Sequence, residues 1–145
     1  MILIDTNVLV YSINSSAPYH HQCKMLAEAV KAKKIPGVIF PQILHEFFSI
    51  ITNERRVEKP LSSLQALEQV KIIKKIFLIQ NPPLDYLNYL ENLIKEHNLR
   101  GVDIYDASLV AQMLSLKIST ICTYNTNDFR RYSEIEVITP EDIFK

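Results

Sequence analysis

The chain of 145 residues contains only two glycines. Loops that bind nucleotide phosphates use clustered glycines, because the backbone must approach the phosphate closely. Neither a dinucleotide-binding fingerprint nor a Walker motif is present. A flavodoxin-like protein or a small phosphatase is disfavoured for the same reason, since no phosphate-binding loop and no nucleophile are visible.

Cysteine is equally scarce, with only Cys23 and Cys122. Cys122 lies in an apolar run, where a thiol usually behaves as a small buried hydrophobe. Two such residues form neither a disulfide framework nor a Cys-rich zinc site, which fits a reducing cytoplasm. No apolar stretch approaches the roughly 20 residues of a membrane span. Asp5 interrupts the apolar N-terminus, so we expect a cytoplasmic protein without a signal peptide or membrane association.

An excess of charge of either sign is also missing, because 16 Lys and Arg residues balance 16 Asp and Glu residues. Nucleic-acid binders often carry a basic surplus, so any RNA contact must come from local patches. The hydrophobic content of 48% excludes disorder. The length predicts one domain, residues 1–145, with a single core.

Short apolar runs alternate along the chain with segments of helical periodicity. Such an alternation predicts an α/β fold in which helices cover both faces of a parallel sheet. The expected strands lie at 2–4, 37–40, 77–80, 119–123 and 137–138. The expected helices lie at 8–13, 20–33, 41–51, 64–76, 84–97 and 103–116, with a charged linker at 55–63.

Asp5 directly follows the first expected strand. Ligands bind at the carboxyl ends of parallel strands, which makes Asp5 a candidate site residue. Aspartate is also a preferred N-cap, so Asp5 could instead begin the next helix. The sequence favours neither interpretation.

Glu46 falls at the edge of the apolar arc of helix 41–51, beside Ile43 and Ile50. A glutamate at such an edge is usually a solvated or snorkelling side chain. The position of Glu46 alone therefore indicates no function.

Asp106 lies within the apolar stripe of helix 103–116, with Val110 and Met113 one and two turns further on. An ionised carboxylate on a core-facing stripe is costly unless something compensates it. An alternative makes Asp103 the N-cap and Asp106 the third helical residue of a capping arrangement. That alternative does not explain why the stripe carries the acid, so we favour a functional role for Asp106.

Asp128 follows the strand at 119–123 in an Asn-rich turn, where local hydrogen bonding alone can explain an aspartate. Three of the four acids nevertheless share strand ends and helix starts on one rim of the expected sheet. Converging carboxylates repel one another, and a hard divalent cation relieves that repulsion. The sequence therefore predicts a rim suited to Mg²⁺-assisted phosphodiester hydrolysis.

In this order, the acidic segments resemble the PIN domain, and most closely the VapC-type ribonuclease toxins of prokaryotic toxin–antitoxin pairs. The resemblance spans nearly the whole chain and rests on Ile2–Leu9, Glu46, Tyr105–Ala111 and Thr123–Phe129. It implies a PIN-like three-layer α/β/α sandwich with a central parallel sheet. It also implies one or two Mg²⁺ or Mn²⁺ ions and cleavage of single-stranded RNA.

The resemblance further implies roles for individual residues of this chain. The catalytic residues would be Asp5, Glu46, Asp106 and Asp128. Asp5, Asp106 and Asp128 would bind the metal, and Glu46 would orient or deprotonate the attacking water. Many relatives have an acid where this chain has Asn125, so the fourth ligand is Asn125, Asp128 or a water held by either. The expected supporting residues are Asn7, Asp103 and Thr123.

The expected partners are single-stranded or structured RNA, a second copy of the chain and an antitoxin protein. Arg130 and Arg131 follow the fourth acidic segment and are the best candidates for RNA contacts. Apolar and aromatic residues such as Phe47, Phe48 and Tyr86 exceed what one core easily hides, which favours an interface.

Two alternative functions remain at the level of sequence. One is a housekeeping PIN nuclease of RNA processing, and the other is a non-catalytic PIN-fold module that binds RNA or protein. Asp5, Glu46 and Asp106 are all present, which argues against the non-catalytic module.

Overall fold

A computed structural model describes all 145 residues. Five strands form one sheet in the order β3-β2-β1-β4-β5. All four neighbouring pairs are parallel, as predicted. The strands are β1 (Ile2–Ile4), β2 (Gly37–Ile39), β3 (Leu78–Ile79), β4 (Thr120–Cys122) and β5 (Glu136–Ile138).

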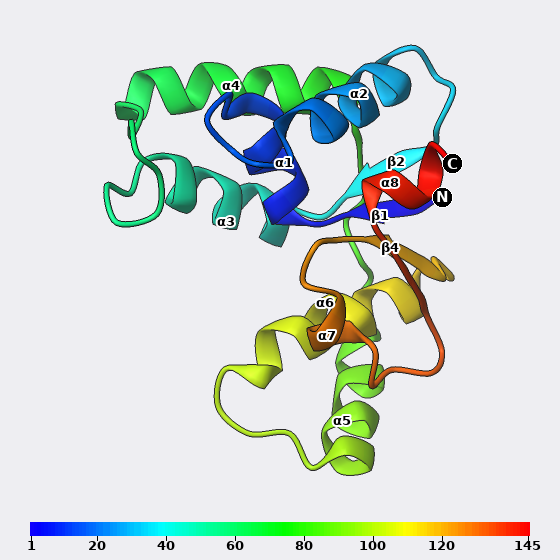
Figure 1. The fold of residues 1–145 in the computed structure, drawn as a ribbon. Coiled ribbons are helices and arrows are strands. Elements are labelled where there is room, and N and C mark those ends of the chain that lie inside the picture. Colours follow the sequence, from blue (N-terminus) through cyan, green and yellow to red (C-terminus); the bar gives the residue numbers. More distant parts are fainter.

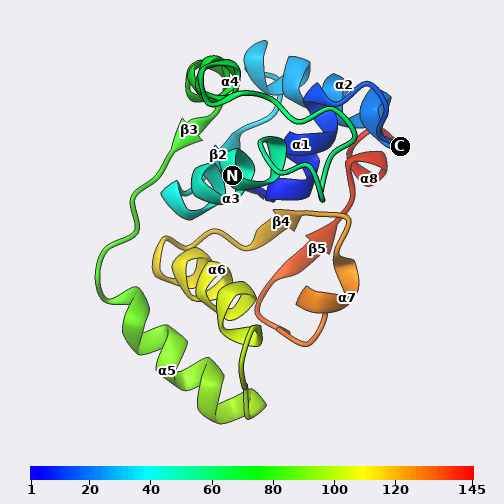
Figure 2. The same cartoon turned by 90° about the vertical axis from the view of Figure 1, so that its left-hand side faces the viewer.

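Helices cover the sheet on both sides and complete the predicted three-layer α/β/α sandwich. The first group lies above the sheet in Figure 1 and comprises α1 (Thr6–Ile13), α2 (His20–Lys31), α3 (Pro41–Ile51) and α4 (Ser63–Ile76). The second group lies below it and comprises α5 (Tyr86–His97), α6 (Asp103–Ser115) and α7 (Thr126–Phe129). Figure 2 shows the same division from the side, with α5 packed on α6.

The strand order reverses between β1 and β4. From β1 the chain builds outward to β2 and β3, and then returns to place β4 and β5 on the other side of β1. In open parallel sheets, ligands bind at this switch point, beyond the carboxyl ends of the strands. Asp5 follows β1 and Thr123 follows β4, so both residues lie at that position.

The core is one cluster of 29 buried residues, to which β1 and β2 contribute with helices from both layers. Phe47 is fully buried in it, while Phe48 and Tyr86 pack against it and are only partly buried. Phe47 is therefore unavailable to a partner, whereas the expected interface itself stays a prediction. The strongly exposed apolar side chains are instead Leu64, Leu84 and Val102, at 77%, 80% and 78% exposure.

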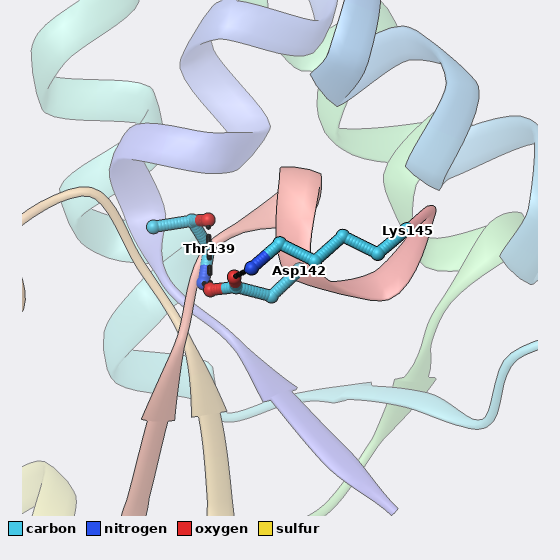
Figure 3. Close-up of polar contacts among 3 residues, drawn as sticks. All are labelled: Thr139, Asp142 and Lys145. Carbon is cyan, nitrogen blue, oxygen red and sulfur yellow. Dashed lines mark hydrogen bonds and ion pairs between the residues drawn. The ribbon is translucent and has the colours of Figure 1, made fainter.

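Two short helices were not predicted. α7 forms where the sequence indicated only a turn, and α8 (Pro140–Ile143) follows β5. A capping box starts α8: the Asp142 carboxylate accepts hydrogen bonds from the backbone N–H of Thr139 at 2.8 Å and from its hydroxyl at 3.0 Å. Lys145 pairs with the same carboxylate at 3.0 Å (Figure 3). The Thr139 backbone hydrogen bond and Lys145 lower the Asp142 pKa to about 2.

The longest helix, α4, has 14 residues. No helix in the structure combines the length and the apolar character that crossing a membrane would require.

Candidate active site

Asp5 has both of the roles that the sequence left open. Its Oδ1 accepts a 2.8 Å hydrogen bond from the backbone N–H of Thr6, so it caps α1. The same side chain is only 5% exposed and borders the switch point of the sheet. Burial raises its pKa, although hydrogen bonds from Thr123 and Thr6 partly oppose this shift. The cap therefore holds a buried carboxylate at the place where parallel sheets bind ligands.

Thr123 and Asn7 fix the second oxygen of Asp5. The Thr123 hydroxyl donates to Asp5 Oδ2 at 2.7 Å, and the Asn7 side-chain amide donates to the same oxygen at 3.2 Å. The Thr123 oxygen also accepts from the Asn7 amide at 3.2 Å and from the backbone N–H of Asn125 at 3.0 Å. The structure thus places Asn7 and Thr123, the predicted supporting residues, in direct contact with Asp5.

Glu46 is partly buried on α3 and is held at both oxygens. The Thr6 hydroxyl donates to Oε2 at 2.8 Å. The Gln42 amide, one turn earlier on α3, donates to Oε1 at 3.1 Å. A carboxylate that accepts at both oxygens has a fixed plane, so Glu46 is not the freely solvated side chain that its edge position indicated.

Asp106 lies in the first turn of α6 and is partly buried. Its pKa is raised to about 6, most strongly by burial and then by the charges of Asp128, Asp5, Glu46 and Asp103. The alternative in which Asp103 is the N-cap is wrong, because α6 begins at Asp103 and its N-cap is Val102, with no side-chain cap.

A polar hollow of about 460 Å³ unites the first three acids. Asp5, Glu46 and Asp106 come from three distant segments and line it together. The cationic side chain in its wall is Arg56, from the loop between α3 and α4, and His45 and Ser49 complete the α3 side. Asn125 lines the same hollow, whereas Asp128 does not.

Asp128 lines a smaller adjoining hollow of about 50 Å³, together with Asp103 and Asp106. Asp106 is thus shared between the two hollows. Arg131 borders the smaller hollow and lies 4.0 Å from Asp103, while Arg130 donates to the Asn127 side chain at 3.2 Å. Both arginines are exposed beside the site, but neither lines the main hollow.

Arg56, Gln42 and Gln112 lie in or beside the site, although none of them was predicted as a site residue. Arg56 lies in a charged linker, where its proximity to Asp5 depends on the tertiary fold. Gln112 carried a local signal, since it is a lone amide among the apolar residues of α6 and is only 5% exposed.

The side chains around the main hollow suit a hard divalent cation such as Mg²⁺ or Mn²⁺. Asp5, Glu46 and Asp106 line it, and their side chains carry oxygens, the donor type that Mg²⁺ prefers. Burial, and then the negative charges of the neighbouring acids, raise the pKa of Asp106, and a divalent cation would relieve that repulsion. In the structure, no group of three or more His, Cys, Asp or Glu side chains is arranged so that it could hold a metal ion.

Comparisons of the sequence and of the structure with known proteins both find VapC proteins. Ribonuclease VapC24 of Mycobacterium tuberculosis is 24% identical in an alignment of 144 residues that covers 97% of each chain. The structure resembles the Sarcin-Ricin loop cleaving toxin VapC20 of Mycobacterium tuberculosis, with a TM-score of 0.67, 17% identity and coverage of 91% of this chain and 95% of that one. It also resembles VapBC2 of Rickettsia felis, with a TM-score of 0.69, 17% identity and coverage of 96% and 98%.

The family model for the PIN domain matches residues 2–135, which include the four strands β1 to β4 and every acid of the site. A match of this extent, on a chain with the same fold as the toxins above, identifies the family. The chain belongs to the PIN domain family.

Proposed function

We propose that this chain is a Mg²⁺-dependent endoribonuclease that hydrolyses phosphodiester bonds in single-stranded RNA, and that it is the toxin of a toxin–antitoxin pair. One observation carries the proposal: Asp5, Glu46 and Asp106, from three distant segments, line one polar hollow. The similarity to a ribonuclease over 97% of the chain supports the reaction class.

Asp5 and Asp106 would bind the ion, with Asp128 or Asn125 at the fourth position. When bound, Mg²⁺ would neutralise the phosphate and polarise it toward attack. Because the carboxylates alone do not form a complete metal site, waters and substrate oxygens would supply the remaining ligands, as Mg²⁺ commonly requires.

The protein's own side chains would orient the reactants. Glu46, fixed by Thr6 and Gln42, would accept a proton from the attacking water. Arg56 lies in the wall of the same hollow and has no carboxylate within ion-pair distance, so its guanidinium is free to bind a phosphate oxygen. Arg131, beside the adjoining hollow, would contact the next part of the strand.

A cleavage assay on a pool of single-stranded RNA tests this function. We expect cleavage with Mg²⁺, none in excess EDTA, and recovery when Mg²⁺ is restored. Asp106→Asn should be inactive, whereas Glu91→Gln, an exposed acid on the remote α5, should cut like the parent. Undiminished cleavage in excess EDTA would refute the metal-dependent mechanism.

The proposed partners are a second copy of the chain and an antitoxin protein, and we propose the cytoplasm as their location. Structures similar to this one include toxin–antitoxin complexes, such as that from Klebsiella pneumoniae, with a TM-score of 0.65. Exposed Leu64, Leu84 and Val102 offer apolar surface for such contacts. Light scattering should show a dimer, and a monomer at high concentration would contradict the homodimer.

A further inference from the structure

A buried glutamine connects α6 to α3. Gln112 is 5% exposed, and its α6 neighbours Val110, Ala111 and Met113 are fully buried apolar residues. An amide in such surroundings is costly unless it is hydrogen-bonded. Gln112 meets this need by donating to Oε1 of Gln42 at 2.9 Å and to the Ser108 hydroxyl at 3.1 Å.

Both the oxygen and the nitrogen of the Gln42 side-chain amide form hydrogen bonds. Its oxygen accepts from Gln112 at 2.9 Å and from the Ser108 hydroxyl at 3.4 Å. Its nitrogen donates to Oε1 of Glu46 at 3.1 Å and to the backbone carbonyl of Tyr105 at 3.4 Å. If the amide were flipped, its oxygen would face two acceptors, the Glu46 carboxylate and the Tyr105 carbonyl. Its nitrogen would face the N–H donor of Gln112. The two donors on α6 therefore fix which end of Gln42 faces Glu46.

We propose that Gln42 and Gln112 are positioning residues that hold the Glu46 carboxylate in its reactive orientation. This inference rests on the proposed ribonuclease function. Gln42 acts directly on Glu46, and Gln112 acts through Gln42 by setting the direction of its amide.

The network also fixes where Glu46 lies relative to Asp106. Gln42 bonds to the carbonyl of Tyr105, the residue before Asp106, and to Glu46 on its own helix. One side chain thus ties together the two helices that carry these acids. Thr6 holds the other oxygen of Glu46 and follows Asp5 in the chain, so all three acids share one hydrogen-bonded frame.

Methionine variants test the proposal, because methionine keeps the length of glutamine and removes its hydrogen bonds. The variants are Gln42→Met and Gln112→Met. The matched control is Gln69→Met, which changes a partly buried helical glutamine on α4 with no side-chain hydrogen bond to the site. Single-turnover cleavage and RNA affinity are measured for each variant, with melting temperature as a check of folding.

Misplacing a reacting group by about 1 Å can cost about 100-fold in rate. We expect Gln42→Met to lower the cleavage rate by about tenfold or more, with RNA affinity unchanged within about twofold. Gln112→Met should cost less, because Ser108 still donates to Gln42. In a Glu46→Gln background, Gln42→Met should have no further effect on the residual rate.

The side-chain amide of Gln42 gives a readout that does not depend on cleavage. Its NMR resonance should shift in Glu46→Gln and in Gln112→Met, and should not shift in Gln69→Met. This measurement tests the contact itself, whereas the rates test its use.

Two results would overturn the proposal while the nuclease function stands. One is a parent-like rate for Gln42→Met, and the other is an equal loss in the parent and Glu46→Gln backgrounds, which would indicate packing alone. If the parent protein cuts no RNA in Mg²⁺ or Mn²⁺, the proposed function itself is wrong and the positioning role falls with it.

Discussion

The hydroxyl of Thr123 donates a 2.7 Å hydrogen bond to Oδ2 of Asp5, which joins residues 118 positions apart in the sequence. Thr123 is fully buried, and Asp5 is nearly so. Because burial raises the Asp5 pKa and this hydrogen bond lowers it, Thr123 favours the ionised form that a metal needs. The contact also joins the ends of β1 and β4, so it serves the fold and the site together.

Thr123→Val should therefore lower both the stability of the fold and the cleavage rate. The valine keeps the shape but leaves a buried carboxylate oxygen with one donor fewer, which costs about 1–3 kcal/mol. Urea denaturation measures this loss, and the cleavage rate at limiting Mg²⁺ should fall as well. The matched control is Thr120→Val on the same strand, whose hydroxyl makes only an exposed 3.4 Å contact with Glu136. A parent-like stability for Thr123→Val would show that the contact has no energetic weight.

Arg56→Gln should weaken RNA binding without slowing the chemical step. Arg56 lies in the wall of the main hollow, and its turn is held by backbone hydrogen bonds from Arg56 and Val57 to the Asn53 carbonyl at 3.0 and 3.1 Å. Removing one phosphate contact should lower affinity by about tenfold and reduce the salt dependence by about one charge. Fluorescence anisotropy without Mg²⁺ measures both effects.

Arg55→Gln is the control for that experiment, since Arg55 is exposed in the same turn but does not line the hollow. If the two variants bind RNA equally well, Arg56 has no special contact. A loss confined to Arg131→Gln would instead favour the arginines that follow the fourth acidic segment.

Asp128→Asn should decide which residue serves as the fourth ligand. After burial, Asp128 is the largest cause of the raised Asp106 pKa, so it acts on this proposed metal ligand even though it lines the adjoining hollow. We expect the Mg²⁺ concentration for half-maximal cleavage to rise by about tenfold. Asn125→Ala is the comparison, because Asn125 lines the main hollow. An unchanged Mg²⁺ titration for Asp128→Asn, with a shifted one for Asn125→Ala, would assign the position to Asn125.

The sequence predicted the layers of the fold well because the strands are short, continuous apolar runs and the helices carry clear periodicity. All five strands and the six long helices that carry the site or cover the sheet appear where expected, within a few residues. α7 and α8 were missed because each has only four residues, too few to show a helical period.

The site was predictable only in part, for a physical reason. Asp5 and Asp106 stand out locally, one after a strand and the other on an apolar stripe. Glu46 does not, because what distinguishes it is the pair of hydrogen bonds that its carboxylate accepts from Thr6 and Gln42. These residues contact Glu46 only in the folded chain. Arg56 does not stand out in the sequence either, since nothing in its linker indicates that the loop turns back over the acids.

Asp106→Asn should abolish cleavage and yet stabilise the metal-free protein. The folded-state pKa of Asp106 is about 6, above the ordinary value of 3.8, because burial and four neighbouring acids disfavour its charge. Between these values the folded state binds more protons than the unfolded state, so the parent loses stability as the pH rises from about 4 to about 6. Asparagine carries no charge and keeps the size of aspartate, so the mutant should escape this loss without opening a cavity.

The gain in stability of Asp106→Asn over the parent should be absent below about pH 4 and complete above about pH 6. The two pKa values set this window. A shift of this size corresponds to at most about 3 kcal/mol. Because Asp106 is partly exposed and solvent screens its neighbours, about 1 kcal/mol is a better expectation. The control Asp103→Asn, in the same helical turn, should change stability by no more than about 0.5 kcal/mol.

With Mg²⁺ bound, the parent should become more stable than Asp106→Asn. A ligand at about 100 times its Kd stabilises the folded state by roughly 2.7 kcal/mol, and the mutant should lose most of this increment. Thermal melts of the parent and Asp106→Asn at pH 5 and pH 7, with and without Mg²⁺, separate the two contributions. If Asp106 only supported the start of α6, the neutral side chain would lose about 0.3–1 kcal/mol of helix-dipole stabilisation at pH 7 and would retain cleavage. A mutant that melts lower without metal and still cuts RNA would therefore remove Asp106 from the catalytic site.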